Sequence, residues 1–170
     1  MAVTQSTLRQ RLKQATEPAH VSLEANVGAL DSIPGYARYL IGQHAFRAAV
    51  EAWLADFPVA TDAWRPQRLA AELRHDLTDL GLPLLAPSAI SAHAPNENFV
   101  MGVHYVLEGS ALGARVLTKH VEPLGITRDH GARHLWAQSD SLGNFRAYRS
   151  CSDRRPNRWF APPKASPPAS

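Results

Sequence analysis

Apolar side chains recur every three or four residues along most of this chain, and no long window alternates between apolar and polar residues as a strand does. The first apolar stripe runs from Leu8 to Leu30, with a possible helix break at Pro18. Residues 31–35 are typical of a turn, and Pro34 suits the first turn of a following helix. The spacing therefore predicts helices from the N-terminus onward.

Prolines and glycines set the expected ends of the next helices. The second predicted helix carries aromatic and aliphatic residues from Tyr36 onward and stops at Pro58. A third helix begins near Pro66 and ends at Gly81, a residue type that commonly caps helix C-termini. Residues 82–95 contain three prolines and predict a loop.

The C-terminal half continues the helical pattern and then loses it. A long helix is predicted over 96–121, followed by two short helices near 127–137 and 141–149. Five prolines lie between residues 152 and 170, which favours an irregular tail. We therefore expect an all-α, single-domain helical bundle over 1–150 and a proline-rich irregular tail over 151–170.

Composition agrees with a globular chain. The 170 residues are 45% hydrophobic, enough to bury one core without disulfides. The single cysteine, Cys151, excludes an internal disulfide and a cysteine-based zinc site within this chain.

Charge and hydropathy limit the expected class of protein and its expected location in the cell. A net charge of +3 is mildly basic, with much of the excess toward the C-terminus, and does not indicate a nucleic-acid-binding protein. The N-terminal residues lack the pattern of a secretory signal, and apolar runs are too short to span a membrane. A cytoplasmic protein is the expectation.

One segment with candidate chemistry is LKQATEPAHVSLE, in which His20 and Glu24 are four residues apart and share a helix face. A neutral imidazole is a good ligand for haem iron, and a carboxylate one turn away can orient its second ring nitrogen. A lone histidine beside an apolar helix stripe is, however, more often structural or exposed. This segment alone therefore does not identify His20 as a haem ligand.

The second segment is YVLEGSALGARVL, where Gly109 and Gly113 lie in the middle of a predicted helix. Each costs roughly 1 kcal/mol relative to alanine. Their spacing leaves a flat strip without side chains and allows the helix to bend. Either a planar ligand or a tightly packed neighbouring helix would explain the strip equally well.

Taken together, the two segments resemble the haem oxygenases, especially bacterial members found with phytochrome-type photoreceptors. LKQATEPAHVSLE resembles the proximal helix of that family, and YVLEGSALGARVL resembles its kinked, glycine-containing distal helix. The resemblance implies haem as cofactor and substrate, held between the two helices. It also implies conversion of haem to biliverdin with release of iron and carbon monoxide, using O₂.

The resemblance also implies roles for matching residues. His20 would be the iron ligand, Glu24 would lie behind it, and Lys13 would pair with a haem propionate. Gly109 and Gly113 would form the distal face together with Ser110. The remaining residues expected at the haem are Tyr105, Ala114, Arg146 and Tyr148. An electron donor such as a ferredoxin or a reductase, and a bacteriophytochrome as acceptor of biliverdin, are the implied partners.

Three departures from the family pattern keep a second hypothesis open. Ala114 replaces a glycine of many relatives, Pro18 precedes the proposed ligand by two residues, and the chain after Gly143 turns proline-rich. Ala114 and the altered C-terminus suggest a non-catalytic haem or bilin binder, a sensor or carrier, as the alternative. A helical interaction module that binds no tetrapyrrole is a third hypothesis.

Other histidines give no site of comparable strength. His130 and His134 are four apart but lack the accompanying pattern of a zinc protease. His75, Asp76 and Glu72 are expected on a charged, solvated helix face.

Overall fold

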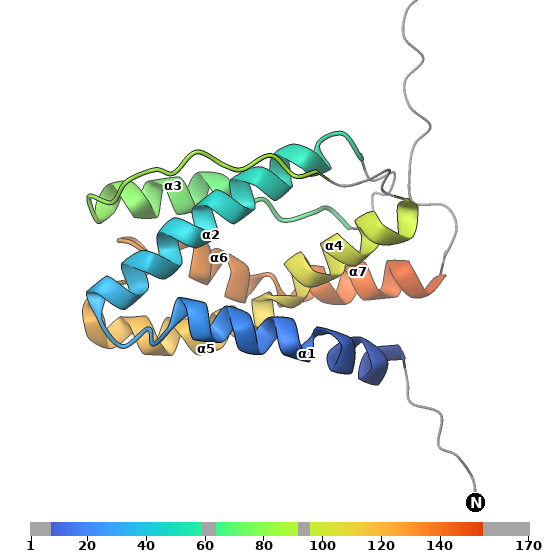
Figure 1. Ribbon diagram of the computed structural model, residues 1–170, viewed down its shortest axis with the longest axis horizontal. Helices are drawn as coiled ribbons and strands as arrows, with labels where there is room; N and C mark the ends of the chain where they lie inside the picture. Colours follow the sequence, from blue (N-terminus) through green and yellow to red (C-terminus); the bar gives the residue numbers. More distant parts are fainter. Residues whose placement is uncertain (1–7, 59–63, 92–95, 155–170) are drawn as a thin grey trace, which may run out of the picture.

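The computed structural model describes residues 8–58, 64–91 and 96–154, with the backbone alone at 8–13 and 152–154. In this part of the chain every regular element is helical, as Figure 1 shows. The α-helices are α1 (Leu8–Val27), α2 (Ile33–Leu54), α3 (Ala70–Asp79), α4 (Glu97–Gly109), α5 (Ala111–Val121), α6 (Arg133–Asp140) and α7 (Leu142–Arg154). A short 3₁₀ helix, Glu122–Leu124, follows α5. The predicted all-α class is confirmed.

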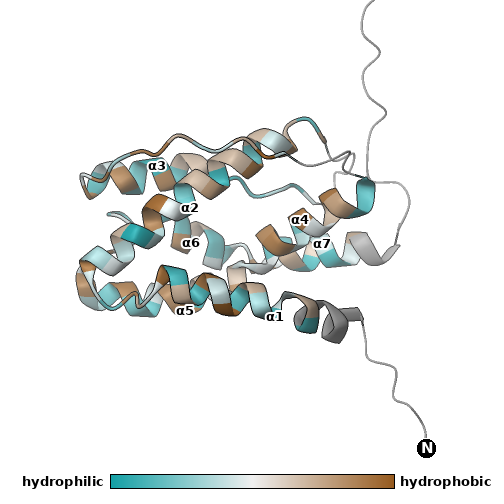
Figure 2. Cartoon of the chain, viewed as in Figure 1, coloured by the Kyte–Doolittle hydropathy of each residue, from teal (hydrophilic) through white to brown (hydrophobic). Residues whose placement is uncertain are grey.

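The main core lies where α2, α3, α5 and α6 meet. It buries leucine side chains of α2, α3 and α6 together with Tyr36 and Ala114. Helix α5 packs on α6, α2 packs on α3, and α4 packs on α7. Figure 1 draws α3 along one edge of the bundle and α1 with α5 along the opposite edge, with α2 crossing obliquely between them. Figure 2 shows that α4 is rich in hydrophobic residues.

Local sequence accounts for the start of α2. Ser32 caps α2 because its hydroxyl accepts a hydrogen bond from the Gly35 amide at 3.3 Å, and Pro34 occupies the first turn. Helix α2 ends at Leu54, four residues before Pro58, in a tight turn through residues 55–57. Pro18 does not interrupt α1, which runs through it.

The long helix predicted over 96–121 is divided at Ser110 into α4 and α5. The hydroxyl of Ser110 donates to the carbonyl of Leu107 at 2.5 Å, a local bond that competes with the regular helical pattern. The Ser110 amide donates to the Val106 carbonyl, and the Ala114 amide donates to the Ser110 carbonyl. Backbone hydrogen bonds therefore continue across the junction between α4 and α5. A break beside Gly109 agrees with the expected kink.

Two predicted boundaries are wrong at the C-terminal side. Helix α6 begins at Arg133 rather than near residue 127, because residues 127–131 form a turn closed by hydrogen bonds between Thr127 and His130. Helix α7 runs to Arg154, so the first four residues assigned to the irregular tail are helical. Residues 155–170 lie outside the described part of the chain. Among the described helices, none is long and apolar enough to cross a membrane.

The turn before α6 requires glycine at position 131. Gly131 has φ +80°, and a Cβ there would lie 3.1 Å from Leu80 Cδ2. Gly125 has a similar φ of +77° but open space around the same position. Both conformations disfavour side chains, whereas Gly131 is also sterically enclosed.

Replacing Gly131 with alanine is therefore expected to lower the free energy of unfolding by about 2 kcal/mol or more, through backbone strain and overpacking. Gly125→Ala, the matched control, carries the strain alone and should lose about 1 kcal/mol. Urea unfolding followed by circular dichroism measures both. Equal losses in the two variants would contradict the role given to Leu80.

Candidate functional site

Helix α1 is almost unpacked along the segment that carries His20. From Gln14 to Asn26 every side chain is exposed except the half-buried Thr16. Only the C-terminal end of this region, at Val27 and Leu30, packs against the main core. Because an isolated helix of this length is marginal in water, the long exposed surface of α1 is suited to a partner other than the described core.

His20 and Glu24 lie on the exposed part of α1, one turn apart. Their side chains make no hydrogen bond or ion pair with other described residues, so the imidazole is sterically free to bind a ligand. Val21 and Leu23 beside them are large apolar residues with 59% and 61% of their surface exposed. The side chain of Lys13 lies outside the described residues.

A second exposed apolar surface follows α4 and α5. It consists of Val106, Gly109, Leu112, Gly113 and Val116, which we call the α4–α5 strip. The three large residues are 54–58% exposed. A Cβ at Gly113 would meet no atom within 4 Å, and a Cβ at Gly109 would touch only the Phe145 ring, at 3.6 Å. The strip is therefore low and apolar at its centre, as its helical spacing predicts.

Ala114 belongs to the opposite side of α5. Its side chain is buried in the main core with Val121 and Leu135. This placement does not support the predicted contact between the Ala114 methyl group and a ligand on the distal face. Packing of α5 against α6 decides the orientation.

The aromatic residues expected at the site form a cluster of their own. Tyr105 is half-buried and packs edge-on against Phe145, with ring centroids 5.7 Å apart. Tyr148 is buried, and its hydroxyl donates to the Met101 carbonyl at 2.8 Å. Burial raises the pKa of Tyr148 to about 12. Arg146, on the other side of α7, is exposed.

Ser110 is tied to α6. The buried side-chain amide of Gln138 donates a hydrogen bond to the Ser110 hydroxyl oxygen. Because the same hydroxyl donates to Leu107, both hydrogen-bonding directions of Ser110 are engaged within the protein. The sequence gives no signal for the Gln138 contact, since 28 residues separate the partners.

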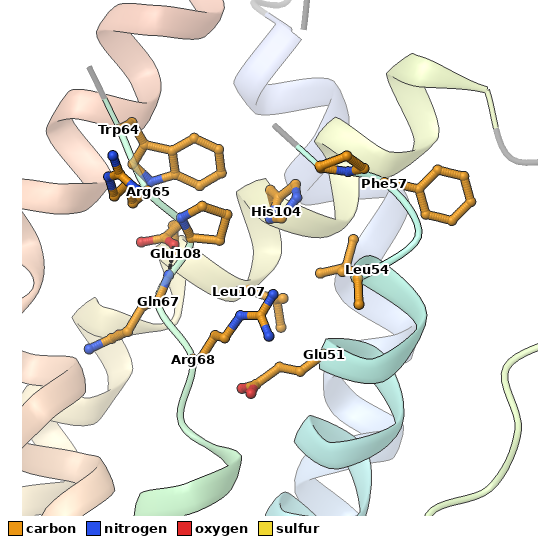
Figure 3. A pocket seen from close by; sticks show the side chains of 13 residues that line it. Glu51, Leu54, Phe57, Trp64, Arg65, Gln67, Arg68, His104, Leu107 and Glu108 are labelled. Atoms are coloured by element: carbon orange, nitrogen blue, oxygen red, sulfur yellow. Dashed lines mark hydrogen bonds between the residues drawn. The ribbon is translucent and has the colours of Figure 1, made fainter. Parts of the chain in front are cut away.

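A further polar group, which the sequence interpretation missed, lies on the other side of α4. Glu108 accepts hydrogen bonds from the Gln67 amide at 2.9 Å and from the Asn144 side chain at 2.7 Å. Burial raises the pKa of Glu108, while these two hydrogen bonds and Arg47 oppose the rise. His104, one turn earlier, is 2% exposed and packs edge-on against Trp64. Figure 3 shows these side chains around one cavity.

Burial lowers the pKa of His104 to about 4, because a charged imidazole is poorly solvated there. The unfolded chain takes up this proton near pH 6.5, so the stability contributed by neutral His104 is lost as the pH falls from about 6.5 toward 4. When the pH is lowered from about 7.5 to 4.5, the free energy of unfolding of His104→Phe should therefore fall by about 2 kcal/mol less than that of the unsubstituted chain.

Urea midpoints at the two pH values test this expectation within each variant, so a constant effect of the substitution cancels. The control is His75→Gln, because His75 is exposed on α3 and faces only Glu72 at 3.8 Å. An equal acid-induced loss in all three proteins would contradict a buried neutral His104.

The other candidate histidines are accounted for structurally. His134 is buried, and its Nδ1 lies 2.7 Å from Asp76, whereas His130 is exposed on the turn. In the described residues, no group of three histidine, cysteine or acidic side chains is placed to hold a metal ion. The expected solvated position is confirmed for His75 and Glu72 but is wrong for Asp76, which is fully buried because it bonds to the first turn of α6.

Fold and site together define a class of protein: an all-α bundle with an exposed, imidazole-bearing helix and a low apolar strip on a kinked helix pair. No family model matches the chain. A curated protein of Xanthomonas campestris pv. campestris (strain 8004), named heme oxygenase, is 29% identical over 122 residues, which are 71% of this chain and 73% of that protein.

The solved structure of the NO- and CO-bound heme oxygenase from Neisseria meningitidis is also similar. It matches with a TM-score of 0.50 and 26% sequence identity, over 82% of this chain and 83% of that one. The chain is thus similar in sequence and in fold to haem oxygenases, the family that the two sequence motifs resemble.

Proposed function

We propose that this chain is a haem oxygenase that opens haem to biliverdin and releases iron and carbon monoxide. It would use O₂ and electrons from an external donor. The named relatives support this proposal, as does the pair of apolar surfaces on α1 and on the α4–α5 strip. When bound, haem supplies the redox-active iron.

The residues present fit such a ligand. Haem iron is held by a protein side chain such as histidine, and His20 is an exposed imidazole without a competing partner among the described residues. The open space above Gly113 allows a flat molecule to approach the backbone of α5. We assign His20 as the iron ligand, Glu24 as the group that orients it, and Lys13 as the partner of a propionate.

On the distal side, Gly109 and Gly113 would leave space for the substrate O₂ because they carry no side chain there. Ser110, held by Gln138, would fix the bend between α4 and α5. Tyr105, Tyr148 and Arg146 are assigned to the edge of the haem site. The tyrosines would act through the packed cluster behind Gly109, and Arg146 through its exposed charge.

The observation that carries the proposal is the exposed apolar surface on both helices of the proposed sandwich. Monomeric proteins rarely leave large contiguous apolar surface uncovered unless it binds something. Haem titration of the purified chain, followed by reduction in air, is the test. A Soret band that gives way to biliverdin absorption with release of carbon monoxide is expected. Stable haem without a bilin product would reject the enzymatic function and leave a haem binder.

We further propose that a ferredoxin or a reductase supplies electrons, that a bacteriophytochrome accepts biliverdin, and that the chain acts in the cytoplasm. The mildly basic chain, with a net charge of +3, is compatible with an acidic electron donor. Salt dependence of the reduction rate with a purified ferredoxin would test the donor.

Filling the strip is expected to block haem without disturbing the fold. Gly113→Leu places a side chain in open space, so the urea midpoint should stay the same or rise slightly. Haem affinity should fall at least about tenfold, because the leucine occupies the proposed distal face. Gly42→Leu, on α2 and equally uncrowded, is the control. Equal haem affinity in the two variants would argue against the α4–α5 strip as the haem contact.

A further inference from the structure

The cavity around His104 has a volume of about 630 Å³ and lies on the other side of α4 from the α4–α5 strip. It is bounded by the end of α2, by α4, and by residues 64–68 (Figure 3). Because His104, Leu107 and Glu108 line this cavity whereas Val106 and Gly109 belong to the strip, the two sites use different faces of one helix. The volume is in the range of cavities that bind small organic molecules.

His104 contributes hydrogen-bonding capacity that the protein leaves unused. Both ring nitrogens are buried and have no hydrogen-bond partner among the described residues. A buried polar group without a partner is unfavourable, so a ligand that bonds to it gains affinity. The neutral ring offers one donor and one acceptor, which suits a hydroxyl group better than an ion.

The acidic side chains of the cavity are already satisfied. Glu51 accepts hydrogen bonds from the backbone amides of Leu69 at 2.7 Å and Ala70 at 3.3 Å, and lies 4.0 Å from the Arg47 guanidinium. Glu108 is bonded as described above. Neither carboxylate therefore requires a cationic ligand.

Arg68, unlike the two glutamates of the cavity, is not engaged by other described residues. Its side chain is exposed, and its guanidinium has no hydrogen bond or ion pair with the described residues. Figure 3 shows the guanidinium directed into the cavity, with Leu107 and Glu51 nearby. A free guanidinium of this kind binds a carboxylate through two parallel hydrogen bonds.

Apart from Arg65 and Gln67, the remaining lining is apolar. Leu54, Phe57, Trp64 and Leu107 supply aliphatic and aromatic walls. Such walls favour a flat ring over a flexible polar molecule, because aromatic surfaces pack against each other edge-on or offset. The Arg68 guanidinium thus favours a carboxylate, the neutral imidazole of His104 favours a hydroxyl group, and the apolar walls favour a ring.

We propose that this cavity is a binding site for a small aromatic carboxylate that carries a ring hydroxyl. The carboxylate binds Arg68, the ring packs against Leu107 and the aromatic walls, and the hydroxyl bonds to His104. The site is separate from the proposed haem site and does not depend on the haem oxygenase function.

Titration of the haem-free chain with para-hydroxybenzoate, followed by amide NMR, tests the proposal. We expect saturable shifts, at ligand concentrations up to about 10 mM, at Trp64, Gln67 and His104 but not at His20 or Gly113. Benzoate should bind more weakly because it lacks the hydroxyl. The cation para-hydroxybenzylamine should not bind.

Variants separate the two polar contacts. Arg68→Gln should weaken para-hydroxybenzoate binding about tenfold, or about 1.4 kcal/mol. Arg74→Gln, an exposed arginine on α3 outside the cavity, should leave it unchanged. His104→Phe should remove the preference for para-hydroxybenzoate over benzoate. The arginine variants decide the outcome if the His104 variant fails to fold.

Three results would overturn the proposal. They are the absence of saturable shifts, equal affinities in Arg68→Gln and Arg74→Gln, and shifts that concentrate on α1 and the α4–α5 strip. Repeating the titration with haem present adds a fourth: competition between the probe and haem would place the probe in the haem site. A chain that takes up no haem still gives a complete result in the haem-free titration.

Discussion

His20→Ala is expected to abolish biliverdin formation and to weaken haem binding at least about tenfold, with loss or displacement of the Soret band. The imidazole is the proposed axial ligand, and its exposed position on α1 means that its removal leaves the described core intact. Circular dichroism and the urea midpoint should therefore match those of the unsubstituted chain. Free imidazole added to the variant should restore part of the spectrum, because it can occupy the vacated coordination position.

His75→Ala is the matched control for this experiment. His75 is an exposed histidine on α3, with only Glu72 nearby, so its removal changes neither haem spectrum nor turnover. If His20→Ala kept the spectrum, affinity and turnover of the parent chain, the assignment of His20 as the iron ligand would be wrong. The distal assignments would then need another proximal partner.

The largest expected effect on stability is that of Asp76→Ala. Asp76 is 0% exposed and accepts hydrogen bonds from the backbone amides of Arg133 at 2.8 Å and His134 at 3.0 Å. It also pairs with the His134 ring at 2.7 Å and the Arg133 guanidinium at 3.3 Å. Its loss leaves the first turn of α6 and a buried imidazole without partners.

We expect Asp76→Ala to lower the free energy of unfolding by about 3–5 kcal/mol, a large part of the stability of a typical domain. Asp79→Ala is the comparison, because Asp79 binds the same turn through Gly131 and Arg133 but is partly exposed. Its loss should be about 1–2 kcal/mol. Urea unfolding at neutral pH measures both. A loss below about 1 kcal/mol for Asp76→Ala would contradict its role as the central link between α3 and α6.

Several helix boundaries were predictable because their signals are local. The Ser32 cap and Pro34 place the start of α2, and Gly81, with φ +62°, follows the end of α3 as expected. The start of α6 was not predictable. Its first backbone amides bond to Asp76, which lies 57 residues earlier in the chain, and no local pattern records such a partner.

Some features of the candidate site were likewise predictable from local sequence, and others were not. The four-residue spacing puts His20 and Glu24 on one face of α1 whatever the rest of the chain does. The orientation of Ala114 toward the core, by contrast, depends on how α5 packs against α6. The cavity around His104 and Arg68 escaped the sequence interpretation entirely, because its walls come from three separate parts of the chain.

The sequence by itself determined the helical class, the imidazole on α1 and the glycines near the bend between α4 and α5. These features follow from helical periodicity and from residue types that act over one or two turns. Tertiary structure alone decided that Asp76 caps α6, that Gln138 holds Ser110, and that the α4–α5 strip and the cavity around His104 lie on different faces of α4. Such contacts join residues 28 to 58 positions apart, and they form only where the helices pack to bury apolar surface.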